Sequence, residues 1–228
     1  MIRVILWDVD GTLLDFHAAE RVAIRHLFER FGLGECTDEM LARYSAINRQ
    51  YWQRLERGEM TKPQILVGRF REFFSTEGLD VSVAEPFNEA YQYSLGDTVA
   101  YCDDSLSIVR SLQGKVGQYV VSNGTIVAQN KKLRLSGLGE LMDGIFLSEQ
   151  VGAEKPSPVF FDHVFAHIEP VDKGEILIVG DSLTGDIRGG KDAGIRTCWY
   201  NPHGETAPAD CLPDYEITDL HQVYDLLK

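Results

Sequence analysis

The chain begins with a short apolar run that ends in two aspartates, and this start limits the folds open to it. Residues 2–7 are almost continuously apolar rather than alternating, which predicts a strand buried on both faces of a sheet. Asp8 and Asp10 follow at the carboxyl end of that strand, and Gly11 supplies a turn. Ligands of open α/β sheets bind at this end of the strands. Two carboxylates so close repel each other, so the pair predicts a metal cation nearby.

Two patterns of apolar residues divide the rest of the chain. From about residue 18 to residue 95 apolar positions recur at the spacing of amphipathic helices, and no segment resembles a strand. A helical block of this length after one strand predicts a separate all-helical domain, residues 16–97. Beyond it, helices alternate with buried strands expected at residues 118–121, 144–147, 175–179 and 195–200. Residues 1–15 and 98–228 are therefore predicted to form an α/β core with a doubly wound parallel sheet and right-handed crossovers.

Two other segments of this core stand out in the sequence. A helix after the second strand carries three basic residues, Lys131, Lys132 and Arg134. The tail from Asn201 contains Pro202, Pro208 and Pro213. It is therefore predicted to be loop until a short final helix near residues 220–227.

The composition excludes several classes of partner. The formal net charge of −13, with no basic stripe, argues against a nucleic acid polymer. It permits a small phosphorylated substrate, because a bound cation and a few lysines reverse the local field. The four cysteines are scattered without a CxxC pair, which favours reduced thiols over a zinc site. No apolar segment reaches the roughly eighteen residues of a membrane span, and no signal sequence precedes the first strand. We therefore expect a cytoplasmic protein that does not enter a membrane.

Three later motifs carry candidate chemistry. Ser122 and Asn123 end the second strand, Lys155 precedes a proline, and Asp181 and Asp186 follow the fourth strand. Each has an ordinary structural explanation, since Ser-Asn-Gly is common in turns, most lysines are solvated and acids cap helices. Together they supply hydroxyl and amide donors, a cation and metal ligands. A parallel sheet places its strand ends along one edge, so these groups are predicted to converge on Asp8.

Taken together, the four motifs resemble those of the haloacid dehalogenase-like (HAD) superfamily of phosphohydrolases, and the resemblance covers the whole chain. It implies a Rossmann-like core with strand order 5-4-1-2-3 and Mg²⁺ as the cofactor. The helical insert after the first motif is similar to the cap domain of that family. An acid–base group at position 10 favours phosphoryl transfer over dehalogenation.

The resemblance also implies a role for each motif residue. Asp8 would attack phosphorus and form an aspartyl-phosphate, which is covalent catalysis by a carboxylate. Asp10 would protonate the leaving oxygen, later activate water, and ligate the metal through its main-chain carbonyl. The phosphate-binding residues are Ser122, Asn123 and Lys155, the metal ligands are Asp8, Asp10 and Asp181, and the supporting residues are Thr12 and Asp186.

The cap is expected to set the substrate. The strings 47–52, 58–61, 122–125 and 154–158 look similar to the pyrimidine 5'-nucleotidase branch, which implies a nucleoside 5'-monophosphate as the small phosphorylated partner. Candidate contacts to that substrate are Phe16, His17, Asn48, Tyr51 and Trp52, although aromatics at helical spacing are more often core residues. Many capped members carry Tyr-Pro-Gly where the chain re-enters the core, and here Tyr101-Cys102-Asp103 stands there.

Other functions stay open on the sequence. The same scaffold could serve a sugar-phosphate or phosphoglycolate phosphatase, or a phosphomutase. A non-catalytic phosphate-binding regulator is disfavoured, because Asp8, Asp10, Lys155 and Asp181 are all intact. Both a monomer and a homodimer are compatible with the sequence.

Overall fold

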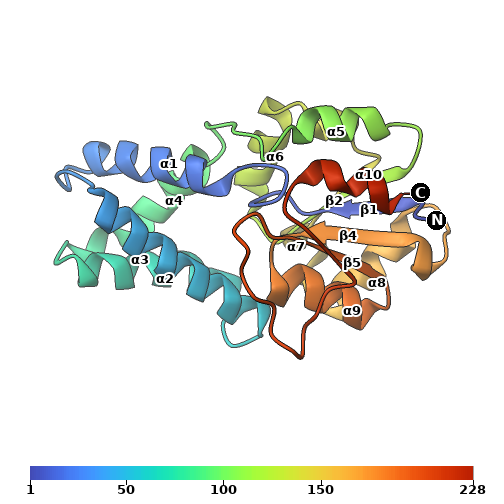
Figure 1. The fold of residues 1–228 in the computed structure, drawn as a ribbon. Helices are drawn as coiled ribbons and strands as arrows, with labels where there is room; N and C mark the ends of the chain where they lie inside the picture. The colour runs from blue at the N-terminus through green and yellow to red at the C-terminus, as the bar shows by residue number, and fades with distance from the viewer. Residues whose placement is uncertain (228) are drawn as a thin grey trace.

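A computed structural model describes residues 1–227 and shows one six-stranded sheet beside a bundle of helices (Figure 1). All neighbouring strands pair in parallel, in the order β3-β2-β1-β4-β5-β6. The strands are β1 (Val4–Trp7), β2 (Gly117–Ser122), β3 (Gly144–Leu147), β4 (Ile176–Gly180), β5 (Arg196–Tyr200) and β6 (Tyr215–Ile217). The predicted doubly wound sheet and the order of its first five strands are confirmed.

The sixth strand was not expected. The prediction of loop from Asn201 to the final helix is wrong at Tyr215–Ile217, which pairs with β5 so that Tyr200 lies opposite Ile217. Three residues are too few to display an alternating pattern. The strand forms because the open edge of β5 offers unpaired backbone groups to it.

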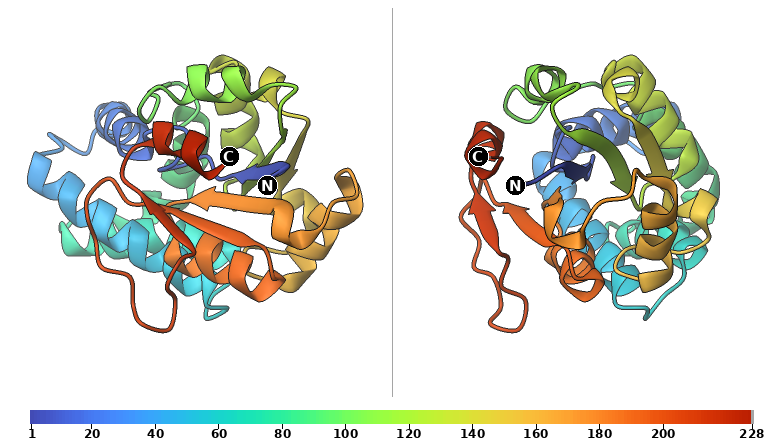
Figure 2. Two further views of the ribbon diagram at one scale, coloured as in Figure 1. Left: turned by 45° about the vertical axis from the view of Figure 1, so that its right-hand side comes forward. Right: turned by 90° about the vertical axis from the view of Figure 1, so that its right-hand side faces the viewer.

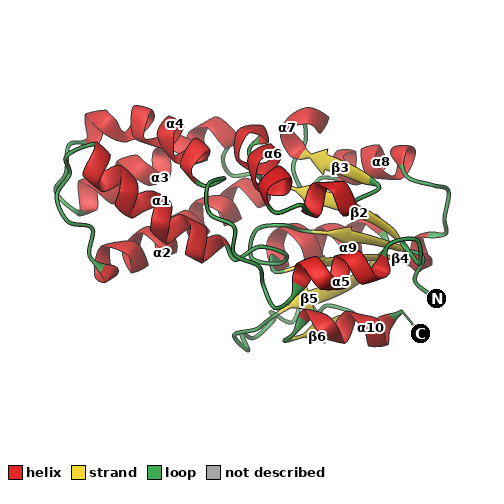
Figure 3. Cartoon of the chain, turned by 90° about the horizontal axis from the view of Figure 1, so that it is seen from above, coloured by secondary structure: helices red, strands yellow, loops and turns green. Residues whose placement is uncertain are grey.

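Helices cover both faces of the sheet (Figure 2). Ile5 and Trp7 of β1 point into the apolar layer formed with α5 (Ser105–Leu112), α6 (Ile126–Leu135) and α10 (Val223–Leu226). Val4 and Leu6 point into the opposite layer, where α8 (Pro158–His167) packs. The short α7 (Ser148–Val151) and α9 (Arg188–Ala193) also border this second layer, through Val151 and Ala193. Figure 3 shows α7 at the end of β3. Because successive side chains of a strand alternate in direction, a strand covered twice must be apolar throughout.

Four helices lie apart from the sheet and form a helical bundle: α1 (Phe16–Arg30), α2 (Asp38–Glu56), α3 (Lys62–Thr76) and α4 (Ala84–Ser94). Their apolar stripes meet in a core of their own, which is rich in aromatic rings: Phe28, Tyr44, Phe70, Phe73, Phe74, Phe87 and Tyr91. Thr61 begins α3 through a capping box with Gln64, which shows how polar residues set the helix ends. No helix within residues 1–227 is long and apolar enough to cross a membrane.

The chain leaves and re-enters the sheet region at one place. Leu14 forms a bridge with Tyr101, and the Asp15 amide donates to the Ala100 carbonyl at 2.8 Å. Asp103 has a φ of 45°, in the left-handed region that favours glycine. Its carboxylate accepts from the Tyr200 hydroxyl at 3.1 Å and from the Leu220 amide at 2.7 Å. These bonds offset the backbone strain at Asp103.

Candidate active site

Three neighbouring strands deliver polar residues to one pocket. Asp8 follows β1, Ser122 ends β2 and Asp181 follows β4. Because β1 lies between β2 and β4 in the sheet, these ends meet at the same edge. All three residues line a pocket of about 310 Å³ that also touches the helical bundle. The predicted convergence of the motifs is therefore present in the fold.

Lys155 ties two of the acids together. Its ammonium is buried and donates to an Asp8 oxygen at 2.8 Å, to an Asp186 oxygen at 2.6 Å and to the Val121 carbonyl at 2.8 Å. Three acceptors use all three donors of the group. Burial lowers the pKa of Lys155, but the carboxylates of Asp186 and Asp8 outweigh it and raise that pKa above its ordinary value. The lysine therefore carries a fixed positive charge at the pocket floor.

The acids outnumber this lysine. Oxygens of Asp8, Asp181 and Asp186 all lie within 4.8 Å of one another. Burial raises the pKa of Asp8 to about 7, with Lys155 opposing the shift and Asp186 adding to it. Asp181 is exposed at the surface of the pocket, yet desolvation by the surrounding protein, and then the charges of Asp8 and Asp186, raises its pKa well above the usual value. A concentrated set of hard oxygen donors with excess negative charge fits a divalent cation such as Mg²⁺.

The loop after β2 holds the backbone around Lys155. The Asn123 side chain donates to the Lys155 carbonyl at 2.9 Å and accepts from the Lys155 amide at 2.8 Å. The Ser122 hydroxyl accepts from the Gly124 amide at 3.0 Å and stays within the pocket lining. The Lys155–Pro156 peptide is cis. The Asn123 side chain therefore positions Lys155, a role the sequence did not indicate.

The turn after Asp8 needs glycine at its tip. Gly11 has a φ of 93°, and a Cβ there would lie 2.6 Å from an Asp181 oxygen. The Thr12 side chain is fully buried, and its hydroxyl has no hydrogen-bond partner within residues 1–227. Thr12 lies behind the pocket rather than in its lining.

Asp10 is held by a helix that the motifs do not include. One carboxylate oxygen accepts from the Lys132 ammonium, and the other accepts from the Gln129 amide nitrogen at 2.5 Å. Both donors belong to α6. The sequence marks Lys132 only as one of three basic residues, and nothing in the pattern separates it from its neighbour Lys131. Gln129 carries no sequence signal at all.

The turn between α2 and α3 brings two further residues to the sheet region. Glu56 lines the pocket and accepts hydrogen bonds from the hydroxyls of Ser182, at 2.9 Å, and Thr184. Burial raises the pKa of Glu56 to about 7. Lys62 donates to the Ser148 hydroxyl at 2.5 Å. The sequence does not mark Glu56 or Lys62 as a site residue, because their hydrogen-bond partners lie far away along the chain.

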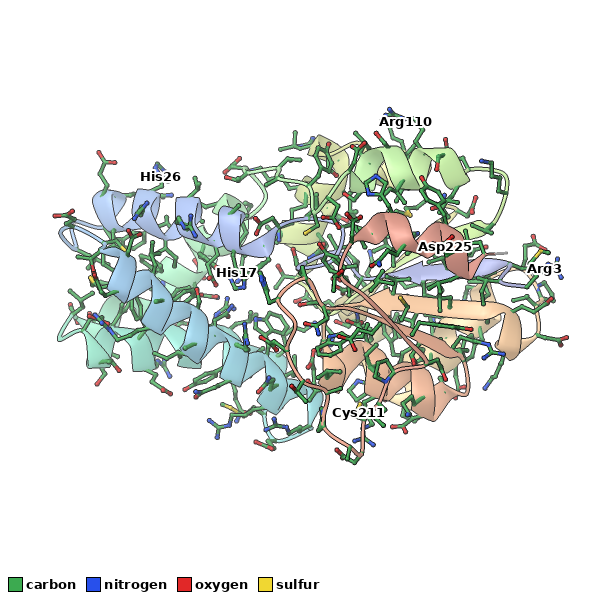
Figure 4. All side chains as sticks on the ribbon, viewed as in Figure 1. Arg3, His17, His26, Arg110, Cys211 and Asp225 are labelled. Carbon is green, nitrogen blue, oxygen red and sulfur yellow. The ribbon has the colours of Figure 1, made fainter. Side chains whose placement is uncertain are left out.

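The bundle residues named as candidate substrate contacts separate into two groups. Phe16, His17, Asn48 and Trp52 line the pocket, and Figure 4 shows His17 on the part of α1 nearest the sheet region. Tyr51 does not line it. That ring is packed in the bundle core, and its hydroxyl donates to a Glu72 oxygen at 2.9 Å.

The end of β5 and the first residues of the tail line another side of the pocket. Residues 199–203 and Glu205 line it, and Glu205 pairs with Arg49 of α2 at 3.0 Å. The Asn201 side chain holds this segment by accepting from the Glu205 amide at 2.9 Å and donating to its carbonyl at 2.9 Å. A proline-containing loop gives no hint of this placement.

Comparison with known proteins gives consistent matches. A family model for haloacid dehalogenase-like hydrolases matches residues 2–194. The HAD-hydrolase YfnB of Bacillus subtilis is 37% identical over 226 residues, which cover 99% of this chain and 95% of YfnB. The pyrimidine 5'-nucleotidase PynA of Streptococcus pneumoniae is 32% identical over 228 residues, covering 99% and 94% of the two chains. The pyrimidine 5'-nucleotidase YjjG of Escherichia coli is 29% identical, covering 98% and 96%.

The fold matches a solved structure as well. The crystal structure of YfnB bound to magnesium, which reveals interdomain movement in that protein, superimposes with a TM-score of 0.94 at 36% identity. The match covers 100% of this chain and 99% of the YfnB chain. Both the superfamily and the nucleotidase branch suggested by the motifs are thus present among the relatives.

Proposed function

The chain belongs to the haloacid dehalogenase-like hydrolases, and from this membership we propose that it is a Mg²⁺-dependent phosphomonoesterase acting through an aspartyl-phosphate. One observation carries the proposal. The Asp8 carboxylate stands at a strand end, fixed by Lys155 and flanked by Asp181 and Asp186, in a pocket that reaches the helical bundle. In this proposal Asp8 is the nucleophile, Lys155 the cation and the neighbouring aspartates the metal ligands, and their closeness in one pocket supports these roles.

The first step transfers the phosphoryl group to Asp8. Lys155 bonds one oxygen of Asp8, so the other oxygen attacks phosphorus while the bond from phosphorus to the ester oxygen breaks. Asp10 gives a proton to the departing oxygen, which leaves as an alcohol. The negative charge on the phosphoryl oxygens is stabilised by Lys155, the Ser122 hydroxyl and the backbone amide of Asn123.

The second step releases phosphate. Asp10, now a carboxylate, takes a proton from a water molecule, whose oxygen attacks phosphorus and frees Asp8. Mg²⁺, when bound, supplies further neutralisation of the phosphoryl charge. The residues that would hold it are Asp8, Asp181 and the Asp10 carbonyl, with Asp186 fixing Lys155 beside them.

For the substrate we propose a nucleoside 5'-monophosphate. Two relatives that span nearly the whole chain are pyrimidine 5'-nucleotidases, which supports this class. The pocket offers Phe16 and Trp52 as apolar surfaces for a base, at the side of the helical bundle. In this proposal the bundle, residues 16–97, acts as the cap over a core made of residues 1–15 and 98–228.

A panel of phosphate esters tests both parts of the proposal. We expect Mg²⁺-dependent phosphate release, with kcat/KM higher for nucleoside monophosphates than for sugar phosphates or phosphoglycolate. The Asp8→Asn variant should show no turnover and no acid-stable incorporation of labelled phosphate. Turnover that survives in Asp8→Asn removes the nucleophile assignment, and equal use of sugar phosphates removes the nucleotidase assignment. Asp162→Asn, on the outer helix α8, is the matched control and should keep full activity.

A further inference from the structure

Lys132 and Gln129, two residues of α6, have no part in the mechanism above. Their side chains nevertheless donate hydrogen bonds to the two carboxylate oxygens of Asp10. We propose that they are positioning residues, which hold the Asp10 carboxylate where it can protonate the departing oxygen. The inference rests on the acid–base role given to Asp10 in the proposed function. It adds a requirement for α6 that the four motifs do not contain.

The two donors form one binding face. They are three residues apart on α6, so they project from the same side of the helix, and each takes a different oxygen of Asp10. A carboxylate bound at both oxygens has a fixed plane as well as a fixed place. Asp10 nevertheless keeps 24% of its side chain exposed and lines the pocket, so a substrate can still reach it.

Lys132 acts through Asp10 and not on the substrate. Its side chain is 2% exposed and does not line the pocket. The ring of Phe16, which does line the pocket, lies 5.2 Å from the Lys132 ammonium. Among residues 1–227, the ion pairs of the structure give Lys132 one carboxylate partner, Asp10.

Stability alone does not account for such a pair. Removing an ammonium from water costs several kcal/mol, and apolar replacements of buried ion pairs are often as stable. A buried lysine with one carboxylate partner is therefore better explained by the orientation it imposes on that partner.

The same helix also joins Asp10 to the phosphate-binding loop. Thr125 caps α6 directly after Ser122-Asn123-Gly124. A Cβ at Gly124 would lie 2.2 Å from the Gln129 amide nitrogen, so glycine there leaves the room that Gln129 occupies. Ser122 and Asn123, which the proposed function places at the phosphoryl group, and Gln129 and Lys132, which contact Asp10, thus belong to one continuous segment of the chain.

The leaving group provides a test that a merely structural role would not pass. An alkoxide or a phenolate needs a proton as it departs, whereas para-nitrophenolate departs readily without one. In Lys132→Met we expect kcat/KM for phenyl phosphate to fall about 100-fold more than kcat/KM for para-nitrophenyl phosphate, the range of general acid catalysis. The parameter kcat/KM covers only the steps up to formation of the aspartyl-phosphate, so water activation does not enter it.

The ratio of the two kcat/KM values does not depend on how much of the variant is folded, because both are measured on the same preparation. Gln129→Met should shift the ratio in the same direction by less, since it removes a neutral donor. Lys132→Gln, which keeps a donor, should recover part of the loss. The matched control is Arg134→Met, an exposed cation on the same helix, which should leave the ratio unchanged.

Asp10→Asn separates the inference from the function beneath it. If Asp10→Asn shifts the ratio and Lys132→Met lowers kcat/KM equally for both substrates, the positioning role is overturned while the proposed function stands. If Asp10→Asn itself leaves the ratio unchanged, the acid role of Asp10 is wrong and the inference is overturned with it. A shift in both variants, with none in Arg134→Met, supports the inference.

Discussion

Glu56, the last residue of α2, accepts a hydrogen bond from the Ser182 hydroxyl at 2.9 Å and so joins the helical bundle to the loop after β4. Asp181 begins that loop, and Asp186 lies in the helical turn Leu183–Ile187 that follows it; these two acids flank Asp8. A Cβ at Gly185 would lie 2.6 Å from a Glu56 oxygen, so the loop is shaped around this side chain. Lys62, on the other side of the same turn, bonds Ser148. The turn between α2 and α3 is therefore docked by two polar anchors beside the acid cluster.

Replacing Glu56 should weaken this docking. We expect Glu56→Ala to raise KM for nucleoside monophosphates about tenfold and to lower the free energy of unfolding by about 1–3 kcal/mol, because the Ser182 and Thr184 hydroxyls lose their acceptor. Steady-state kinetics and urea unfolding measure the two effects. Glu59→Ala is the control, since Glu59 is exposed in the same turn. Equal behaviour of the two variants would show that the Glu56 contact does not matter.

Removal of Lys155 should affect both stability and catalysis. In Lys155→Met the carboxylates of Asp8 and Asp186 lose their shared buried cation. We expect a loss of about 3–5 kcal/mol in the free energy of unfolding, as for other broken buried ion pairs. Phosphate release should fall by more than about 100-fold, because the phosphoryl oxygens lose a charge that stabilises them.

The comparison variant for Lys155 is Lys173→Met, which removes an exposed ammonium bonded to the Ala193 carbonyl. It should keep its activity and nearly all its stability. Wild-type turnover in Lys155→Met would rule out the phosphate-binding role of this lysine.

The acid cluster should make metal binding and pH act on stability together. Asp8 and Glu56 have folded-state pKa values of about 7, so these groups bind protons more tightly in the folded chain than in the unfolded one. Their contribution to stability is therefore fully present below the unfolded pKa, about pH 4, and is lost as the pH rises towards about 7. A cation bound to the ionised carboxylates offsets their repulsion in place of those protons, and so stabilises the folded chain.

We therefore expect Mg²⁺ to raise the melting temperature more at about pH 8 than at about pH 5.5, where protons compete with it. Scanning calorimetry at each pH, once with Mg²⁺ and once with chelator, gives the four melting temperatures needed. In Asp181→Asn, the rise in melting temperature caused by Mg²⁺ should differ less between the two pH values. An equal Mg²⁺ effect at both would contradict the linkage.

Trp52 should contribute to binding of the base. Trp52→Ala is expected to raise KM for nucleoside monophosphates by about tenfold, within the range of about 1–3 kcal/mol for stacking of a base on an aromatic ring. The KM for para-nitrophenyl phosphate should change little. Tyr51→Phe is the matched control, because the Tyr51 ring is packed in the bundle core and does not line the pocket. Parallel changes for both substrates in Trp52→Ala would contradict a role in base recognition.

The sequence was sufficient to predict the place of a site residue when that residue lies at the end of a strand. Asp8, Ser122 and Asp181 could be grouped because each stands at the carboxyl end of a buried strand, and parallel strands align those ends. The helical block from about residue 18 to residue 95 was likewise foreseeable, because its apolar positions recur at helical spacing. The strand order came from family resemblance, because alternation of strands and helices does not by itself order a sheet.

Other parts of the site have no local signal. Gln129 and Lys132 lie more than a hundred positions from Asp10 along the chain, and Glu56 is equally remote from Ser182. Strand β6 forms only because the edge of β5 is free to pair. Contacts of this kind depend on how finished elements pack, and no periodicity in the sequence encodes them.

The sequence by itself therefore determined the helical block, the first five strands and the candidate groups at the strand ends, because apolar period and turn residues act over short distances. Only the tertiary structure decided which cation faces which acid. It placed Lys155 between Asp8 and Asp186, and Lys132 rather than Lys131 against Asp10. The physical reason is that an ion pair is fixed by the packing of two separate surfaces, which exists only after the chain has folded.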